Sequence, residues 1–282
     1  MRTLGHLVLC SCLATSLASC GGGGGGSSNG GGGAGPTPTP QSLTITPGTA
    51  SLRVNQTETF TGTLTLSNGT TQAVQPTWQS DNVTVLTFES NVARGRGNGT
   101  ATIIGTAQGL TATRLIRVYP DYQGVWAGDY VVRRCTESGA FVGSEFCDRE
   151  NGFQAGDVLP VEFDLRQQDQ TVNGSMALGQ IEGTFTGSID ANGRLAGTGS
   201  LTFTTDEGSL AFALDPISVE VQGDRMTGRF TVTVTSPGFT GQGLLETELN
   251  TVVRVASGSG TSGRGPTVTS GTLRDFTRAL RR

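Results

Sequence analysis

Three pairs of neighbouring carboxylates are the residues of this chain best suited to acid–base chemistry. They are Glu162 with Asp164, Asp206 with Glu207, and Glu246 with Glu248. Residues two apart on a strand point to the same face, so the first and third pairs would each present two carboxylates together. Two such groups flanking a sugar can hydrolyse a glycosidic bond. Exposed strand faces carry carboxylate pairs routinely, and a solvated surface explains these residues better.

The chain lacks most other residues on which catalysis depends. Its one histidine, His6, lies in a segment expected to be removed as an export signal, and the chain has no lysine, so the mature protein is expected to contain neither residue. This composition excludes nucleophiles served by histidine, Ser–Lys dyads, Schiff-base lysines and zinc sites that use histidine. No Gly-rich phosphate loop follows a strand and opens a helix. We therefore expect no enzyme and no cofactor, and a carboxylate-dependent hydrolase is the remaining enzymatic alternative.

Metal ions and nucleic acids are not expected as partners either. Oxygen ligands for calcium occur at two turns, one with Asp190 and Asn192 and one with Asp148, Glu150 and Asn151. Neither turn has the ligand spacing of an EF-hand loop, so no metal site is predicted. The net charge of −4 is too small to indicate binding to nucleic acid.

Residues 1–19 are typical of an export signal. A positive start at Arg2 precedes a mostly apolar run from Leu4 to Leu17, which is too short to cross a bilayer core of about 30 Å as a helix. The run ends in Leu17-Ala18-Ser19-Cys20, which resembles the lipobox of bacterial lipoproteins. The resemblance implies cleavage before Cys20, acylation of its sulfur and anchoring to a membrane, and Gly21 fits sorting to the outer membrane. An ordinary secretory signal is the alternative.

The predicted export determines the oxidation state that we expect for Cys135 and Cys147. Once Cys20 is acylated, these two are the only other cysteines after the leader, and they lie in an oxidising compartment. We therefore predict a disulfide, which would stabilise the fold by roughly 3 kcal/mol through the loop that it closes. Two free thiols are the alternative.

Residues 20–40 form a tether between the lipid and the folded part. Glycine and serine dominate its first half, and Pro36-Thr37-Pro38-Thr39-Pro40 ends it. The Gly-rich half is expected to be a flexible coil and the Pro-Thr half a stiffer, extended spacer.

Residues 41–119 carry an all-β pattern of about seven short strands. Apolar and polar residues alternate along Phe60–Leu66 and Thr100–Thr106, and Asn68-Gly69 indicates a hairpin. The segments Leu43-Thr44-Ile45-Thr46-Pro47, Pro76-Thr77-Trp78-Gln79-Ser80-Asp81 and Gly99-Thr100-Ala101-Thr102-Ile103 resemble bacterial Ig-like group 2 domains, which occur in surface and adhesin proteins. The resemblance implies an Ig-like β-sandwich with Trp78 in its core. Val83-Thr84-Val85-Leu86 departs from the family's usual pattern, which affects loop geometry rather than the fold.

Residues 121–256 predict a second β-domain of a different kind. Half-polar strands follow one another with short turns between them, for example at Asp190–Gly193 and Gly223-Asp224. This meander favours an up-and-down barrel of about eight strands. Glycines on the apolar face, such as Gly187 and Gly197, are expected to permit coiling and to leave room inside.

Gly124-Val125-Trp126, at the start of the first of these strands, resembles the Gly-Xaa-Trp of lipocalin and avidin-like barrels. The resemblance implies that Trp126 closes one barrel end and that a late arginine, here Arg254, covers it. In the alternative, Trp126 simply plugs that end. Residues 257–282 are expected to be a flexible tail with a short helix from Thr272, in which Leu273, Phe276 and Leu280 share a face.

Together these patterns favour an all-β lipoprotein of the cell envelope that acts as a structural or adhesive binding module. Its partner beyond the membrane would be an extracellular protein, a glycan or a small apolar ligand. A lipocalin-like carrier of a small apolar ligand is the first alternative. A barrel interior filled by Phe185, Phe203, Phe212 and Phe230 favours the scaffold, and a cavity of roughly 300 Å³ or more favours the carrier.

Overall fold

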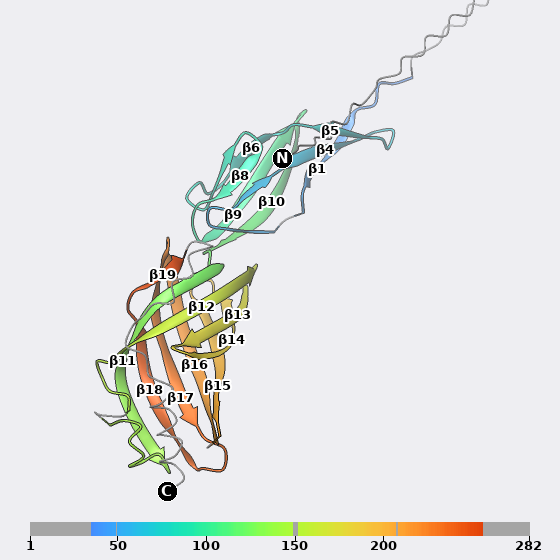
Figure 1. The fold of residues 1–282 in the computed structure, drawn as a ribbon. Coiled ribbons are helices and arrows are strands. Elements are labelled where there is room, and N and C mark those ends of the chain that lie inside the picture. The colour runs from blue at the N-terminus through green and yellow to red at the C-terminus, as the bar shows by residue number, and fades with distance from the viewer. Residues whose placement is uncertain (1–34, 49, 149–151, 207, 256–282) are drawn as a thin grey trace, which may run out of the picture. The chain divides into compact units, whose positions relative to one another are not determined.

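The computed structural model describes residues 35–48, 50–148, 152–206 and 208–255, and its regular elements are all strands (Figure 1). The predicted leader at 1–19, the predicted acylation site Cys20, most of the tether at 20–40 and the predicted tail at 257–282 lie outside these ranges. Within them, no helix is long and apolar enough to cross a membrane.

Residues 40–119 form a β-sandwich of three small antiparallel or mixed sheets. Their orders are β1-β4-β5, β2-β10-β9-β6 and β3-β8-β7. The strands are β1 (Pro40–Thr46), β2 (Ser51–Arg53), β3 (Thr57–Thr59), β4 (Thr61–Leu66), β5 (Thr71–Val74), β6 (Thr77–Ser80), β7 (Leu86–Glu89), β8 (Val92–Gly95), β9 (Gly99–Ala107) and β10 (Leu110–Tyr119). The sequence predicted about seven strands. The larger number arises because β2 and β3 are three-residue segments on different sheets, too short to show an alternation.

The core of the sandwich is aromatic. Trp78 is 8% exposed, and its ring stacks on Phe88 with centroids 5.6 Å apart, while Phe60 lies 6.0 Å from both rings. Trp78 is thus a core residue, as its place in the sequence pattern indicated. The Asn68-Gly69 hairpin is also present between β4 and β5, where the Leu66 amide donates to the Thr70 carbonyl at 2.8 Å.

Residues 124–255 form a closed antiparallel barrel, so the predicted up-and-down barrel of about eight strands is confirmed (Figure 1). Its strands are β11 (Gly124–Gly139), β12 (Val158–Gln168), β13 (Thr171–Leu178), β14 (Ile181–Ile189), β15 (Leu195–Thr205), β16 (Gly208–Gln222), β17 (Arg225–Thr235), β18 (Gly241–Leu249) and β19 (Val252–Val255). The ring closes because β11 pairs with β12 on one side and with β18 and β19 on the other. The last two strands occupy one position in the ring, since each pairs with both β11 and β17.

Alternation along each strand separates a dry interior from a polar exterior. In β12, Val161, Phe163 and Leu165 are buried, whereas Glu162 and Asp164 are exposed. The buried residues of all nine strands join into one hydrophobic cluster. Burial of this apolar surface is the main force that stabilises the barrel.

The inward-facing glycines do not leave empty space, so that expectation was wrong. A Cβ on Gly187 or Gly197 would meet the Phe185 ring at 2.9 or 2.8 Å. The two glycines face each other on β14 and β15, and the Phe185 ring covers both. A Cβ on Gly199 would likewise meet the Met176 sulfur at 2.5 Å. Glycine therefore makes room for large neighbours inside the barrel and not for a ligand.

Candidate functional site

One end of the barrel is closed by Trp126 and Arg254, which the structure brings together. The Trp126 ring is fully buried, and the guanidinium carbon of Arg254 lies 4.4 Å from the ring centroid. The two residues are partners in the β11–β19 ladder, so adjacent strands fix this contact. A cation over an indole face is a stabilising arrangement.

Arg254 is also held by hydrogen bonds that fix the plane of its guanidinium. Its Nη2 donates to the Asp121 carbonyl at 2.7 Å, and its Nη1 donates to the Gln123 carbonyl. Carboxylates of Asp121 and Asp224 lie 3.4 and 3.2 Å from it. With its charge paired and its face on Trp126, this arginine joins the start of the barrel to its last strand.

Tyr122 forms the second part of the same closed end. Its buried hydroxyl shares its proton between the Gly193 and Val219 carbonyls, at 2.8 and 3.0 Å, and accepts from the Leu195 amide at 3.1 Å. Burial raises the pKa of Tyr122 well above its ordinary value. The Trp126 indole donates to the Tyr122 carbonyl at 2.8 Å, which joins the two parts.

Gln167 completes this end from β12. Its side-chain oxygen accepts from the Tyr122 amide at 2.8 Å, and its side-chain nitrogen donates to the carbonyls of Pro120 and Asp169. All these contacts join backbone segments to one another. The arrangement holds these segments of the fold together.

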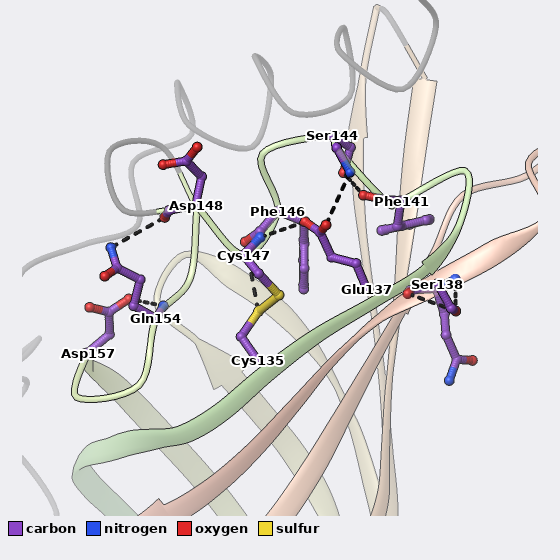
Figure 2. The surroundings of a disulfide bond; sticks show 12 residues. Cys135, Glu137, Ser138, Phe141, Ser144, Phe146, Cys147, Asp148, Gln154 and Asp157 are labelled. Atoms are coloured by element: carbon purple, nitrogen blue, oxygen red, sulfur yellow. Dashed lines mark hydrogen bonds between the residues drawn. A yellow bond between two sulfur atoms is a disulfide. The ribbon is translucent and has the colours of Figure 1, made fainter.

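At the opposite end, the Cys135–Cys147 disulfide joins β11 to the loop between β11 and β12, and the two Cα atoms are 5.6 Å apart (Figure 2). The predicted disulfide is therefore present. Glu137 holds the same loop from β11, because its carboxylate accepts from the Gly143 amide at 3.2 Å and the Cys147 amide at 2.8 Å. The side chain of Glu137 lies beside the disulfide in Figure 2.

Aromatic residues fix this loop to the barrel interior. Phe141 and Phe146 are buried with ring centroids 5.8 Å apart, and Phe153 lies 5.1 Å from Phe146. Phe146 rests on Gly243 of β18, where a Cβ would overlap its ring. The loop is thus a plug with its own aromatic core.

A small apolar cavity lies between this plug and the β13–β14 turn. Its volume is about 30 Å³, and its lining includes Tyr130, Phe153, Leu159, Leu178, Ile181 and Phe203. Ligand pockets usually have volumes of about 300–1,000 Å³. Of the four phenylalanines expected to fill the barrel, Phe185, Phe212 and Phe230 are buried, while Phe203 is partly exposed at this cavity.

Tyr130 lies in the wall of this cavity, and its surroundings shift the pKa of its hydroxyl. Its side chain is 3% exposed, and its ring packs edge-on against Phe230 with centroids 5.2 Å apart. Burial raises the pKa of Tyr130, and the nearby Asp157 carboxylate adds to the rise. Among the described residues, its hydroxyl has no hydrogen-bond partner.

The carboxylate pairs considered for hydrolysis are placed on the outside of the barrel. Glu162 and Asp164 are exposed on β12, and Glu246 and Glu248 are exposed on β18. Glu246 and Glu248 form ion pairs, because Arg134 lies 3.6 Å from Glu246 and Arg133 lies 2.9 Å from Glu248. Asp206 is exposed in the β15–β16 turn, and its predicted partner Glu207 lies outside the described residues. The cavity is not lined by any of these described carboxylates.

Of the two turns considered for calcium, the structure describes the one with Asp190 and Asn192 in full and the other in part. Asp190 uses its carboxylate to accept from the amides of Asn192 and Arg194, at 2.8 and 2.9 Å, so it caps the turn. Glu150 and Asn151 lie outside the described residues. Within the described ranges, no group of three or more His, Cys, Asp or Glu side chains is placed to hold a metal ion.

Sequence patterns missed Tyr122, Gln167, Tyr130 and Glu137. Tyr122 and Gln167 each bind groups distant in the chain, such as Gly193 and Val219, which no local pattern reveals. For Glu137 a weak local signal exists, since it lies between the two cysteines of the disulfide loop. Tyr130 could have been found as the inward residue four positions after Trp126 on the same strand.

Comparisons with known proteins give little further information. No protein-family model and no curated protein matches this chain. A solved structure of the S-layer protein SbsC, domains 5–6, is 15% identical, with a TM-score of 0.28, over 74% of this chain and 98% of that chain. A structure of SbsC domains 4–9 is 14% identical, with a TM-score of 0.27, over 74% of this chain and 31% of that chain. At TM-scores this low, neither likeness bears on the fold or the function of this chain.

Proposed function

We propose that this chain is a lipid-anchored, non-enzymatic module of the bacterial cell envelope with a structural or adhesive role. The observation that carries the choice of a scaffold over a carrier is the filled barrel. Phe185 covers the space beside the inward glycines, aromatic residues plug one end, and the cavity that remains is about 30 Å³. A carrier would need about ten times that volume.

The non-enzymatic part of the proposal is supported by where the polar side chains lie. The buried groups at the Trp126 end bind backbone atoms, and the described carboxylate pairs lie on the exposed outer faces of strands. A hydrolase would need two carboxylates that converge on one substrate, about 5–10 Å apart across a cleft.

Anchoring and location follow from the leader and from Cys20. The Leu17-Ala18-Ser19-Cys20 segment supports acylation of that cysteine, and lipid on this residue would hold the protein to the membrane, with the outer membrane favoured by Gly21. The disulfide supports an oxidising compartment outside the cytoplasm. In this proposal the sandwich, which resembles bacterial Ig-like group 2 domains, acts as a spacer and the barrel offers a contact surface to an extracellular protein or glycan.

The location is tested by expressing the full chain with its leader in a bacterium that processes lipoproteins. Cells are fed an alkyne-tagged fatty acid, and the membrane fraction is examined for the labelled protein. We expect label and membrane association for the parent and their loss in a Cys20→Ala variant, whereas the Cys135→Ala, Cys147→Ala variant keeps both. A parent protein that carries no label contradicts the anchoring.

The adhesive role is tested by saturable binding of the full mature protein to immobilised extracellular proteins and glycans. Glu162→Gln with Asp164→Asn serves as the enzymatic control. We expect a saturable partner among the macromolecules and no hydrolysis of the glycans by parent or variant. Turnover of a glycan that the double variant abolishes would replace the proposal with a hydrolase.

A further inference from the structure

An open polar cleft lies between the sandwich and the barrel, which belong to one compact unit of the chain. Its volume is about 840 Å³, within the range of about 300–1,000 Å³ that is usual for ligand pockets. One wall contains Ser51 of β2 with Arg117 and Tyr119 of β10, and the other is formed by residues 168–171, where β12 turns into β13. The cleft lies outside the filled interior of the barrel and is therefore available to a ligand.

Contacts between the sandwich and the barrel hold the two walls of the cleft in place. The Arg53 guanidinium of the sandwich lies 3.2 Å from the Asp121 carboxylate. Across the cleft, the Ser51 hydroxyl donates to the Asp169 carboxylate. The connection from β10 to β11 consists only of residues 120–123. A site that is held in this way before the ligand arrives costs less ordering when the ligand binds.

The barrel wall of the cleft is a hairpin turn whose backbone is held in one conformation. Asp169 has a φ of 53°, a left-handed conformation that aspartate tolerates better than most residues. The buried Gln167 side chain donates to the Asp169 carbonyl at 3.0 Å. The side chains of Gln168 and Gln170 are exposed and form no hydrogen bond within the described part of the chain. Two side-chain amides can therefore donate to a ligand and accept from it.

The sandwich wall contributes an aromatic ring beside a fixed arginine. Tyr119 is half-buried, and the guanidinium carbon of Arg117 lies 5.0 Å from the centroid of its ring. Arg117 Nη2 donates to the Asn98 side chain at 2.9 Å and to the Ala191 carbonyl at 3.0 Å. The Tyr119 hydroxyl forms no hydrogen bond with any described residue. This wall therefore adds part of a ring and one free hydroxyl.

The charges of the cleft do not favour a charged ligand. Among the described residues of its lining, Arg117 is the only basic one and Asp169 the only acidic one. Both are already bonded to groups of the protein, so a charged ligand would lose water without gaining an unpaired counter-charge. An uncharged ligand with many hydroxyls fits better, because hydroxyls pair with amides and with a tyrosine hydroxyl, and the apolar face of a sugar packs on an aromatic ring.

We infer that this cleft binds a neutral glycan, whose hydroxyls bond to the amides of Gln168 and Gln170 and to the Tyr119 hydroxyl. The inference rests on the proposed adhesive function and deepens it, since it names the class of ligand and the place of contact. Such a ligand would contact the sandwich and the barrel together.

The test is binding of the full mature protein, in neutral detergent, to immobilised neutral oligosaccharides of glucose, galactose, mannose and N-acetylglucosamine. Sialylated and sulfated oligosaccharides are the charged probes. The variant Gln168→Ala, Gln170→Ala is compared with the control Gln72→Ala, Gln180→Ala, which removes exposed glutamines outside the lining of the cleft. We expect saturable binding of a neutral oligosaccharide by the parent, about tenfold weaker binding in the first variant and parental binding in the control.

A second arm uses Tyr119→Phe, which keeps the ring and removes the hydroxyl. We expect it to weaken binding of the same oligosaccharide by about three- to tenfold. Equal binding by the parent and both cleft variants would overturn the cleft as the site and leave the adhesive function standing.

A parent protein that binds only the charged probes, or no oligosaccharide, would overturn the inference. Saturable binding to an immobilised extracellular protein would in that case still support the adhesive function, whereas the absence of any macromolecular partner would remove that function as well.

Discussion

Two buried tyrosines, Tyr122 and Tyr130, differ in the hydrogen bonds of their hydroxyl groups. Comparing them therefore measures how much a hydrogen-bonded hydroxyl contributes to stability. The Tyr122 hydroxyl joins three backbone groups, whereas the Tyr130 hydroxyl has no partner among the described residues. Replacing Tyr122 by phenylalanine should lower the free energy of unfolding by about 1–3 kcal/mol, because buried backbone groups lose their partner. Tyr130→Phe, the matched control, should change it by no more than about 0.5 kcal/mol. Equal effects in urea unfolding would contradict this assignment.

The same residues predict how stability depends on pH. Burial raises the folded-state pKa of both tyrosines above the unfolded value of about 10. Their contribution is therefore complete below pH ~10 and is lost as the pH rises toward the folded-state pKa, at up to about 1.4 kcal/mol per pH unit for each. Unfolding measured between neutral and strongly alkaline pH should show this loss. Tyr130→Phe should make the decline shallower, and an unchanged slope would argue against burial of the ionisable group.

Arg254 should stabilise the fold through the charge of its guanidinium and through the contact of that planar group with the Trp126 ring. Arg254→Gln removes the cation from the Trp126 face and most of the bonds to Asp121 and Gln123. We expect a loss of about 1–3 kcal/mol in the free energy of unfolding. The control Arg133→Gln removes an exposed ion pair with Glu248 and should cost less than about 1 kcal/mol. Matching losses would mean that the Trp126 contact adds nothing.

Among the elements of the barrel, the loop between β11 and β12 is the one that a disulfide joins to its neighbouring strand. Its span from Cys135 to Cys147 has no strand beyond Gly139, and it is held by the disulfide, Glu137 and three phenylalanines. Cys135→Ser with Cys147→Ser should lower the free energy of unfolding by roughly 3 kcal/mol. Exchange should increase first at residues 140–157, and uniform acceleration across all strands would contradict a local plug.

The contact between this loop and β18 gives a sharper test. A side chain at Gly243 would overlap the Phe146 ring. Gly243→Ala should therefore destabilise the protein by about 1–3 kcal/mol, and Phe146→Leu in the same protein should recover part of that loss. Double-mutant analysis by chemical unfolding measures the coupling. A coupling energy of zero would mean that the loop does not rest on this glycine.

The sequence could predict those elements whose pattern is local, and it could not predict contacts between residues far apart in the chain. The barrel strands were predictable because alternation is local, as in Glu162 and Asp164 outward with Phe163 inward. The packing of Phe185 over Gly187 and Gly197 was not, because glycine in a strand permits both an empty space and a covering ring. The Tyr122 network was hidden as well, since its partners Gly193 and Val219 lie far along the chain.

The proposed acylation of Cys20 and the filled barrel can be tested together on the natural protein. Each of these two properties predicts a different feature of the mass of the natural protein. Cleavage and acylation fix the covalent mass of the mature chain. A filled barrel predicts that no small molecule remains bound inside it, because a cavity of about 30 Å³ cannot enclose a drug-sized molecule.

Native mass spectrometry of the full protein, extracted gently from the membranes of its own host, measures both at once. We predict a chain that begins at Cys20, carries acyl groups on that residue and retains no stoichiometric small molecule. A chain that begins at Met1 with an unmodified sulfur at Cys20 would contradict the anchor. A small molecule bound one to one would contradict the filled scaffold and restore the carrier.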